Sequence, residues 1–384
     1  MKRLKVAVVS DALYPWHKGG KEVRYRHLLS QLPDHQMDVV VYSMKWWEKT
    51  PPIVYTKNGS LMYRALCPRV SMYRGARRSI FQAVLFAVAT LQLLARDFDV
   101  IEADHMPYLQ LLPLRIIAWL KRAPLVITWH EVWGKEGWRE YVGRAGSLAA
   151  LIEHGFIQLP NAIIAASPGT AEKLFSMGAN RRRVFVAPNA LELERLSGAV
   201  APPAAPELLF VGRLIEHKHA DVAIEATRIL AERGLNVHLG IVGVGPEETR
   251  LQHQVVESSL SDRVTFYLSL SSQDDVWSLI RGSRVLMAPS VREGFGMVVA
   301  EALALGTPVI CADHPDNESS KLIGPNTGSL VEPFDALALA EAAEYWLRDT
   351  STREDRTSAF LEQNSELTVE AMVDSYVRVL RMVT

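Results

Sequence analysis

Short apolar, β-branched runs recur along the chain, separated by longer stretches whose apolar residues follow helical spacing. In the first half these runs are residues 6–9, 39–42, 100–101, 125–128, 163–165 and 184–186. Continuous apolar runs bounded by turns suit strands that are buried on both faces, and their alternation with helices predicts a parallel sheet.

A Pro/Ala segment at residues 201–206 interrupts this pattern, and the alternation then begins again. The second half has strand-like runs at residues 208–211, 237–242, 264–267, 285–288 and 308–311. Its clearest helical stretches are residues 220–233, 333–347 and 369–383. A Pro/Ala stretch without periodicity is typical of a linker. We therefore expect an α/β protein of two Rossmann-like, doubly wound parallel-sheet domains that face a ligand cleft. The expected domains are residues 1–200 and 207–366, and residues 367–384 form a closing helix.

Composition excludes some classes of protein. The 384 residues are 48% hydrophobic and 22% charged, which favours a folded globular protein. Lys+Arg 42 against Asp+Glu 43 argue against a nucleic-acid partner. The two cysteines, Cys67 and Cys311, lie in different expected domains, so we expect no disulfide and a reducing compartment. Asp11 ends the first apolar run too early for a secretory signal. We expect a cytoplasmic protein.

Candidate chemistry gathers after the run at residues 285–288. A loop with Gly294 and Gly296 leads from this strand into a helix, and seven residues separate Glu293 from Glu301. Glycines allow the backbone to approach a ligand closely, and free N–H groups at a helix start suit an anion. This pattern predicts two carboxylates that face one polyhydroxyl ligand.

With this signature, nearly the whole chain resembles the retaining glycosyltransferases of family 4 (group 1), which share the GT-B fold and an E-x7-E motif. The resemblance is strongest over residues 208–332. It implies that Glu293 hydrogen-bonds the donor sugar and that Glu301 holds the ribose hydroxyls of the nucleotide. The backbone of Gly294, Phe295 and Gly296 would approach the sugar and phosphate.

Two cations follow the strand at residues 208–211. Arg213 and Lys218 match the diphosphate-binding pair of these enzymes. A nucleotide diphosphate gains negative charge as it leaves, so fixed cations there stabilise the transition state more than the ground state.

The first domain offers weaker signals. Gly19 and Gly20 follow the first strand, where similar proteins carry a Gly-Gly loop near the donor phosphates or the acceptor. His130 follows the fourth apolar run, where relatives often place a histidine near the donor sugar. The chain departs from the family in residues 313–318, which keep Glu318 but lack the usual glycines, so donor-sugar specificity stays open.

The resemblance implies a hexosyl transfer with retention, from a UDP- or GDP-sugar to a glycan, a glycolipid or a small molecule. We expect no essential cofactor and no metal, since the resemblance implies that basic side chains and helix dipoles do the work that a divalent ion does in the other major glycosyltransferase architecture. Two alternatives remain open: a non-catalytic nucleotide-sugar binding protein and a sugar-nucleotide epimerase on the same fold.

Residues 49–96 contain no acidic residue. Their positive residues are Lys49, Lys57, Arg64, Arg69, Arg74, Arg77, Arg78 and Arg96. An apolar run at residues 80–95 follows, too short to span a membrane. Residues 49–95 could lie on an anionic membrane, on its inner face, as a peripheral segment. Alternatively, residues 80–95 form a core helix, and the arginines are solvated or bind an anionic acceptor.

Overall fold

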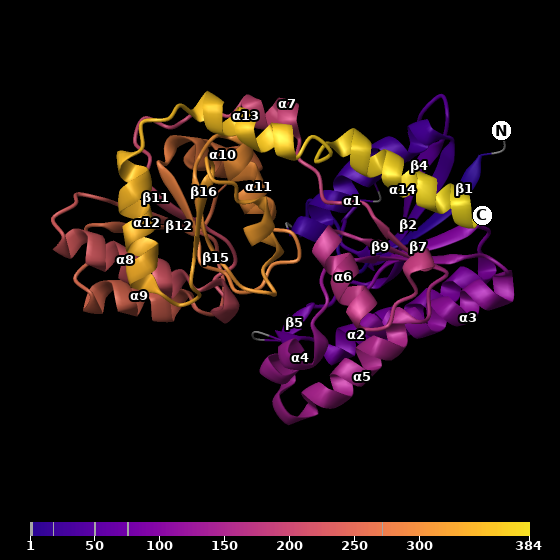
Figure 1. The fold of residues 1–384 in the computed structure, drawn as a ribbon. Coiled ribbons are helices and arrows are strands. Elements are labelled where there is room, and N and C mark those ends of the chain that lie inside the picture. The colour runs from indigo at the N-terminus through magenta and orange to yellow at the C-terminus, as the bar shows by residue number, and fades with distance from the viewer. Residues whose placement is uncertain (1–2, 18, 50, 75–76, 271) are drawn as a thin grey trace. The chain divides into compact units, whose positions relative to one another are not determined.

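The computed structural model describes residues 3–17, 19–49, 51–74, 77–270 and 272–384. The chain forms two compact units (Figure 1): unit 1 is Met1–Ala190 with Val369–Thr384, and unit 2 is Leu191–Thr368. The division falls before Leu191, ahead of the Pro/Ala segment at residues 201–206. The closing helix α14, Val369–Val383, belongs to unit 1.

Unit 1 contains, within the described ranges, an eight-stranded sheet of order β10-β9-β8-β7-β1-β2-β4-β3. Its strands are β1 Leu4–Val9, β2 Met37–Lys45, β3 Val54–Tyr55, β4 Ser60–Pro68, β7 Val100–Asp104, β8 Leu125–Trp129, β9 Ala162–Ala165 and β10 Val184–Val186. Among the described strands of this sheet, β3 alone is antiparallel to its neighbour. The chain reverses its direction of winding between β1 and β7, which pair directly. The sequence pattern located six of these strands but not β3 and β4.

Helices cover both faces of this sheet. α1 (Gly20–Gln31) and α14 bury Tyr25, Leu28, Met372 and Tyr376 on one face. The other face is covered by α2 Ile80–Ala89, α3 Leu111–Lys121, α5 Gly146–Ile157 and α6 Pro168–Ser176 (Figure 1). Strands covered on both sides must be apolar on both sides, which explains their continuous apolar runs.

Unit 2 contains a six-stranded parallel sheet of order β13-β12-β11-β14-β15-β16 in the part of the chain that is described. Its strands are β11 Leu208–Val211, β12 Leu239–Val242, β13 Val264–Tyr267, β14 Val285–Ala288, β15 Val309–Ala312 and β16 Gly328–Val331. Numbered within the unit, the order is 3-2-1-4-5-6, the order of a Rossmann fold. The predicted fold class is therefore confirmed.

The helices of unit 2 also lie on both faces of its sheet. α8 Ala220–Glu232, α9 Glu248–Glu257 and α12 Ala336–Arg348 pack on one core. α10 Gln273–Gly282, α11 Met297–Ala304 and α13 Arg353–Gln363 pack on the other. In such sheets ligands bind outside the carboxyl ends of the strands where the winding reverses, here after β11 and β14.

Candidate functional site

The loop after β14 carries Glu293, and hydrogen bonds fix it to the loop after β15. The Glu293 N–H donates to the carbonyl of Asp316 (3.0 Å), and the Glu318 N–H donates to the carbonyl of Glu293 (3.0 Å). The side-chain amide of the buried Asn317 donates to the carbonyls of Ser290 (2.9 Å) and Ala312 (2.8 Å). Glu293 is therefore held at the switch point by its own backbone, which leaves its carboxylate to interact elsewhere.

That carboxylate forms an ion pair with Lys218. Lys218 ends the short 3-10 helix Glu216–Lys218, which lies after β11, the neighbour of β14 in the sheet. Arg213 lies on the same connection, exposed to solvent. The structure thus brings two predicted site residues, Glu293 and Lys218, into direct contact.

His217 lies beside this pair. Burial and the neighbouring Lys218 and Arg292 lower the pKa of His217 to about 3, so its ring is neutral at neutral pH. Its backbone carbonyl accepts a hydrogen bond from the Val291 N–H (3.1 Å). This bond joins the β11 connection to the loop that carries Glu293.

Gly296 has a structural requirement for glycine. It caps α11 at its N-terminus with φ 86°, and a Cβ there would lie 2.2 Å from the Cβ of Ser319. Phe295, one residue earlier, is buried. The glycine thus lets the chain enter α11 beside Ser319, and the first N–H groups of that helix have no partner within the helix.

Glu301 lies inside α11 and is 5% exposed. Its carboxylate oxygens accept from the Gln273 amide at 3.3 and 3.4 Å. Burial raises the pKa of Glu301 to about 7. A carboxylate with so few protein partners retains lone pairs for ligand hydroxyl groups.

Gly243 and Gly245, which resemble half of a dinucleotide fingerprint, serve packing. A Cβ on Gly243 would lie 1.9 Å from the Gly212 carbonyl oxygen, and one on Gly245 would lie 2.2 Å from that of Leu214. These glycines therefore let the loop after β12 press against the backbone around Arg213.

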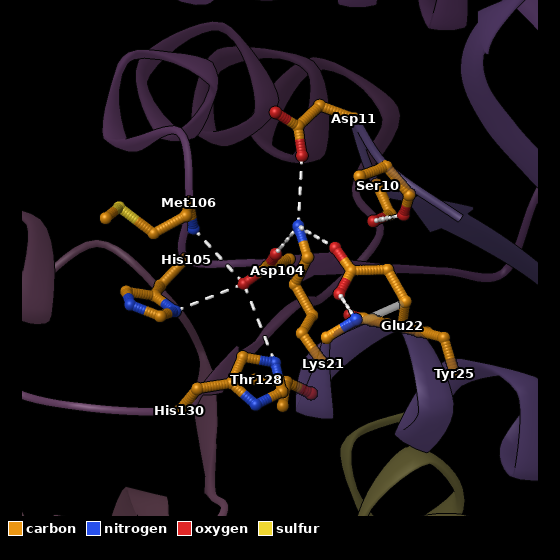
Figure 2. A network of polar contacts seen from close by, with 12 residues as sticks. Ser10, Asp11, Lys21, Glu22, Tyr25, Asp104, His105, Met106, Thr128 and His130 are labelled. Atoms are coloured by element: carbon orange, nitrogen blue, oxygen red, sulfur yellow. Dashed lines mark hydrogen bonds and ion pairs between the residues drawn. The ribbon is translucent and has the colours of Figure 1, made fainter. Parts of the chain in front are cut away.

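Unit 1 contains a buried ionic network at its own switch point (Figure 2). Asp11 follows β1, Asp104 ends β7, and Lys21 lies in the first turn of α1. The Lys21 ammonium nitrogen is 3.0 Å from Asp11 Oδ1 and 2.6 Å from Asp104 Oδ2. Asp11 also pairs with Arg78 at 2.9 Å. Sequence reasoning missed Asp11, Lys21 and Asp104, although the rule about strand ends could have found both carboxylates.

The carboxylates and the ammonium group of this network keep one another charged. Burial alone would raise the pKa of Asp104, but Lys21 and a hydrogen bond from His105 hold it well below its usual range. Burial likewise opposes the charge on Lys21, yet Asp104 and Asp11 hold its pKa above the usual range. All three groups are therefore ionised at neutral pH.

His130, a predicted site residue, joins the same network. Its Nε2 lies 3.7 Å from Asp104 Oδ1 (Figure 2). Burial lowers the pKa of His130 to about 3, although Asp104 acts in the opposite direction. The ring is therefore neutral and presents a hydrogen-bonding nitrogen beside a charged carboxylate.

The predicted Gly-Gly loop forms the start of α1. Gly20 is the first residue of the helix, and the Gly19 N–H donates to Glu22 Oε2 at 3.0 Å. This geometry places Lys21, immediately after Gly20, over the ends of β1 and β7. The N-terminal part of the predicted site is thus organised around Lys21.

Comparisons with known proteins show which family the chain resembles. The family model described as Glycosyltransferase Family 4 matches residues 18–195, and the model described as Glycosyl transferases group 1 matches residues 199–360. The chain is 31% identical over 229 residues to a D-inositol 3-phosphate glycosyltransferase of Pseudarthrobacter chlorophenolicus. That alignment covers 56% of this chain and 54% of the relative. The chain thus matches about half the length of this curated relative.

Solved structures show the same fold over the full length. Sucrose-phosphate synthase from Thermosynechococcus elongatus has a TM-score of 0.76 at 20% identity, with 99% of each chain covered. Anabaena HepE in complex with UDP-glucose has a TM-score of 0.75 at 17% identity, covering 99% of this chain and 100% of its own. These neighbours have the GT-B fold of two parallel-sheet domains. With both family models matched in order along the chain, the protein belongs to the family 4, group 1 glycosyltransferases.

Proposed function

We propose that the protein transfers a sugar from a nucleotide-sugar donor to an acceptor hydroxyl group. The observation that carries this proposal is the Lys218–Glu293 ion pair at the switch point of unit 2, next to the glycine-led start of α11. A cation, a fixed carboxylate and free helix N–H groups suit a sugar that is attached to a diphosphate. In this proposal unit 2 binds the donor and unit 1 binds the acceptor.

Within unit 2, each group has a distinct task. Arg213, Lys218 and the N–H groups of α11 bind the diphosphate, and Glu293 binds sugar hydroxyls. Buried Glu301 accepts hydrogen bonds from the ribose hydroxyls, for which its unfilled lone pairs are suited. We propose a UDP- or GDP-hexose as donor, and UDP-glucose is the first to test because HepE was solved with it.

The chemical step we propose retains the anomeric configuration. The bond between the anomeric carbon and the phosphate oxygen breaks, and the acceptor oxygen bonds to the same face of that carbon. The acceptor proton passes to the departing phosphate. Lys218 and Arg213 stabilise the negative charge that develops on the diphosphate, so neither a metal ion nor a cofactor is needed in this proposal.

In unit 1, the hydroxyl groups of a sugar would bind beside the network of Lys21, buried Asp104 and neutral His130. The acceptor would be a glycan, a glycolipid or a small molecule. We further propose that the protein works in the cytoplasm and that its basic segment, residues 49–95, contacts the inner face of the membrane.

A donor screen tests the proposal. Thermal unfolding is followed with UDP-, GDP-, ADP- and CMP-sugars for the wild type and for Glu301→Ala. We expect one nucleotide class to raise Tm in the wild type and to lose most of that effect in the variant. Transfer to mixed acceptors is then assayed with the selected donor, and the product anomer is assigned by NMR. Donor binding without transfer to any acceptor would favour a non-catalytic binding protein, and an inverted anomer would contradict retention.

A further inference from the structure

The outer surface of one helical layer of unit 1 exposes large apolar side chains. On α2, Phe81 is 70% and Val88 59% exposed. α3 exposes Ile116 and Trp119, and α5 exposes Leu148 and Leu151. We call these six residues the apolar face. Single exposed apolar residues are ordinary, but a group of them on neighbouring helices marks an interaction surface.

The three helices belong to one layer of the fold. They cover the same face of the sheet, where their inner residues Phe86, Leu114 and Phe156 are buried in one core. α3 also packs against α2 and against the 3-10 helix Thr90–Ala95 that continues it (Figure 1). Core packing therefore satisfies the inner side of each helix, and the exposed side still lacks an explanation in the fold.

The exposed charges on these three helices have one sign. α2 and its 3-10 continuation carry no charged residue, and α3 carries only Arg115 and Lys121. Residues 105–130 contain no Asp or Glu. The single carboxylate of α5, Glu153, is buried and accepts from the Tyr108 hydroxyl (2.7 Å). The three helices thus combine an apolar surface with exposed cations and no exposed anion.

A hollow of about 650 Å³ lies at the C-terminal end of α3. Arg115, Trp119, Arg122 and Asn161 are among the residues that line it. The Arg115 guanidinium donates to Asn161 Oδ1 (3.1 Å), which fixes its orientation. One guanidinium group can bind two phosphate oxygens at once. The tryptophan side chain is suited to the boundary between water and the hydrocarbon of a bilayer.

We propose that the apolar face docks on an anionic lipid bilayer and that a lipid phosphate enters the hollow between Arg115 and Arg122. The inference rests on the proposed function, in which residues 49–95 contact a membrane. It adds α3 and α5 to the surface that makes this contact. No helix of the described residues is long and apolar enough to cross a bilayer, and the docking is peripheral. A second copy fits less well, because a twofold contact would bring together two copies of a surface that carries cations and no exposed anion.

Co-sedimentation of the full chain with vesicles tests the proposal. The vesicles are phosphatidylcholine alone, or phosphatidylcholine with phosphatidylglycerol, at low and high salt. We expect binding to the anionic vesicles that weakens with salt. Arg115→Gln with Arg122→Gln should weaken it roughly thirtyfold, since each cation contributes about fivefold near an anionic surface. Arg182→Gln with Arg183→Gln is the matched control, since both residues are exposed on unit 1 outside this layer.

A second variant set addresses the apolar contact. Phe81→Ser, Ile116→Ser and Leu151→Ser together should reduce the bound fraction roughly tenfold or more, because binding scales with buried apolar area. Exposed apolar residues of unit 2 supply the control, Val256→Ser, Leu337→Ser and Tyr345→Ser. Each variant must keep the wild-type Tm shift with the selected sugar nucleotide. That measurement separates failure of docking from failure of the proposed function.

Three results would overturn the inference. The first is equal binding of the wild type to neutral and anionic vesicles, or none to either. The second is unchanged binding in both variant sets. The third is a dimer in light scattering that the Phe81, Ile116 and Leu151 substitutions dissociate, which would assign the face to a second copy of the chain.

Discussion

Lys218 and Glu293, 75 residues apart in the chain, form an ion pair across the ends of two neighbouring strands, β11 and β14. In the free protein the lysine is therefore neutralised in part by the carboxylate that we assign to the sugar. A bound diphosphate would compete for the same ammonium group. Each residue of the pair thus controls how available the other is.

Removing the cation tests this relationship. For Lys218→Met we expect kcat/KM for transfer to fall about 100-fold or more, the scale seen when one group that stabilises developing charge is removed. Lys321→Met, which removes a lysine whose side chain is 63% exposed against 21% for Lys218, should retain near wild-type activity. The measurement is initial-rate kinetics with the selected donor.

Glu293→Gln should separate binding from chemistry. Because the substitution releases Lys218, we expect UDP or GDP alone to bind as tightly as to the wild type or more tightly. Transfer should fall, because the sugar loses its charged hydrogen-bond acceptor. Calorimetric titration with UDP or GDP measures the binding, and a rate assay with the selected donor measures the transfer. Weaker nucleotide binding together with normal transfer would contradict this view of the pair.

Gly296→Ala should weaken both the loop and nucleotide binding. The new methyl group would meet Ser319, and φ 86° adds a strain of about 1–2 kcal/mol for a residue with a side chain. Gly234→Ala is a matched control, because Gly234 has φ 83° with nothing within 4 Å. Urea unfolding should show a larger loss for Gly296→Ala than for Gly234→Ala. Adding Ser319→Gly to Gly296→Ala should remove the extra loss of stability, because the clash with Ser319 is gone. The loss caused by the positive φ, which both alanine variants share, should stay.

Glu301 should make stability and binding depend on pH. Since burial raises its pKa to about 7, its stabilising contribution is complete below its unfolded pKa, near 4.5, and is lost as pH rises to about 7. Relative to Glu301→Gln, the wild type should lose up to about 3 kcal/mol of unfolding free energy over this window. Affinity for the selected sugar nucleotide should rise with pH from 6 to 8 in the wild type but not in Glu301→Gln. Glu257→Gln, at an exposed site, serves as control.

Lys21→Met should destabilise unit 1. The variant leaves Asp11 and Asp104 buried without their shared cation, which we expect to lower the free energy of unfolding by about 3–5 kcal/mol near pH 7. In the wild type both carboxyl pKa values are depressed, so this stability is present above about pH 4 and is lost in acid. The difference between wild type and variant should therefore shrink as pH falls. Lys135→Met, at an exposed position, is the control for urea unfolding at each pH.

The sequence predicted the architecture well because its strands are buried on both faces and read as apolar runs. It missed β4 because solvent reaches part of that strand: Arg64 and Ala65 are exposed between buried residues. The E-x7-E spacing indicated Glu293 and Glu301. It could not reveal that Glu293 pairs with Lys218 or that Glu301 is buried.

The network in unit 1 shows the same limit. Asp11, Lys21 and Asp104 are separated in sequence, and each alone resembles an ordinary surface charge. Their contact depends on β1 and β7 being neighbours in the sheet, which is a property of strand order rather than of spacing. The apolar run at residues 80–95 was equally ambiguous. The structure shows that its helix has a buried side at Phe86 and an exposed side at Phe81.

The return of α14 to unit 1 has a consequence for the order in which the chain folds during synthesis. Met372, Tyr376 and Leu380 complete a core whose members outside α14 lie in the first half of the chain. Unit 2 is continuous in sequence, so all of its residues leave the ribosome before this helix does. The core of unit 1 therefore waits for α14, and a released fragment that stops before Val369 should contain a folded second unit and a first unit whose core is still open.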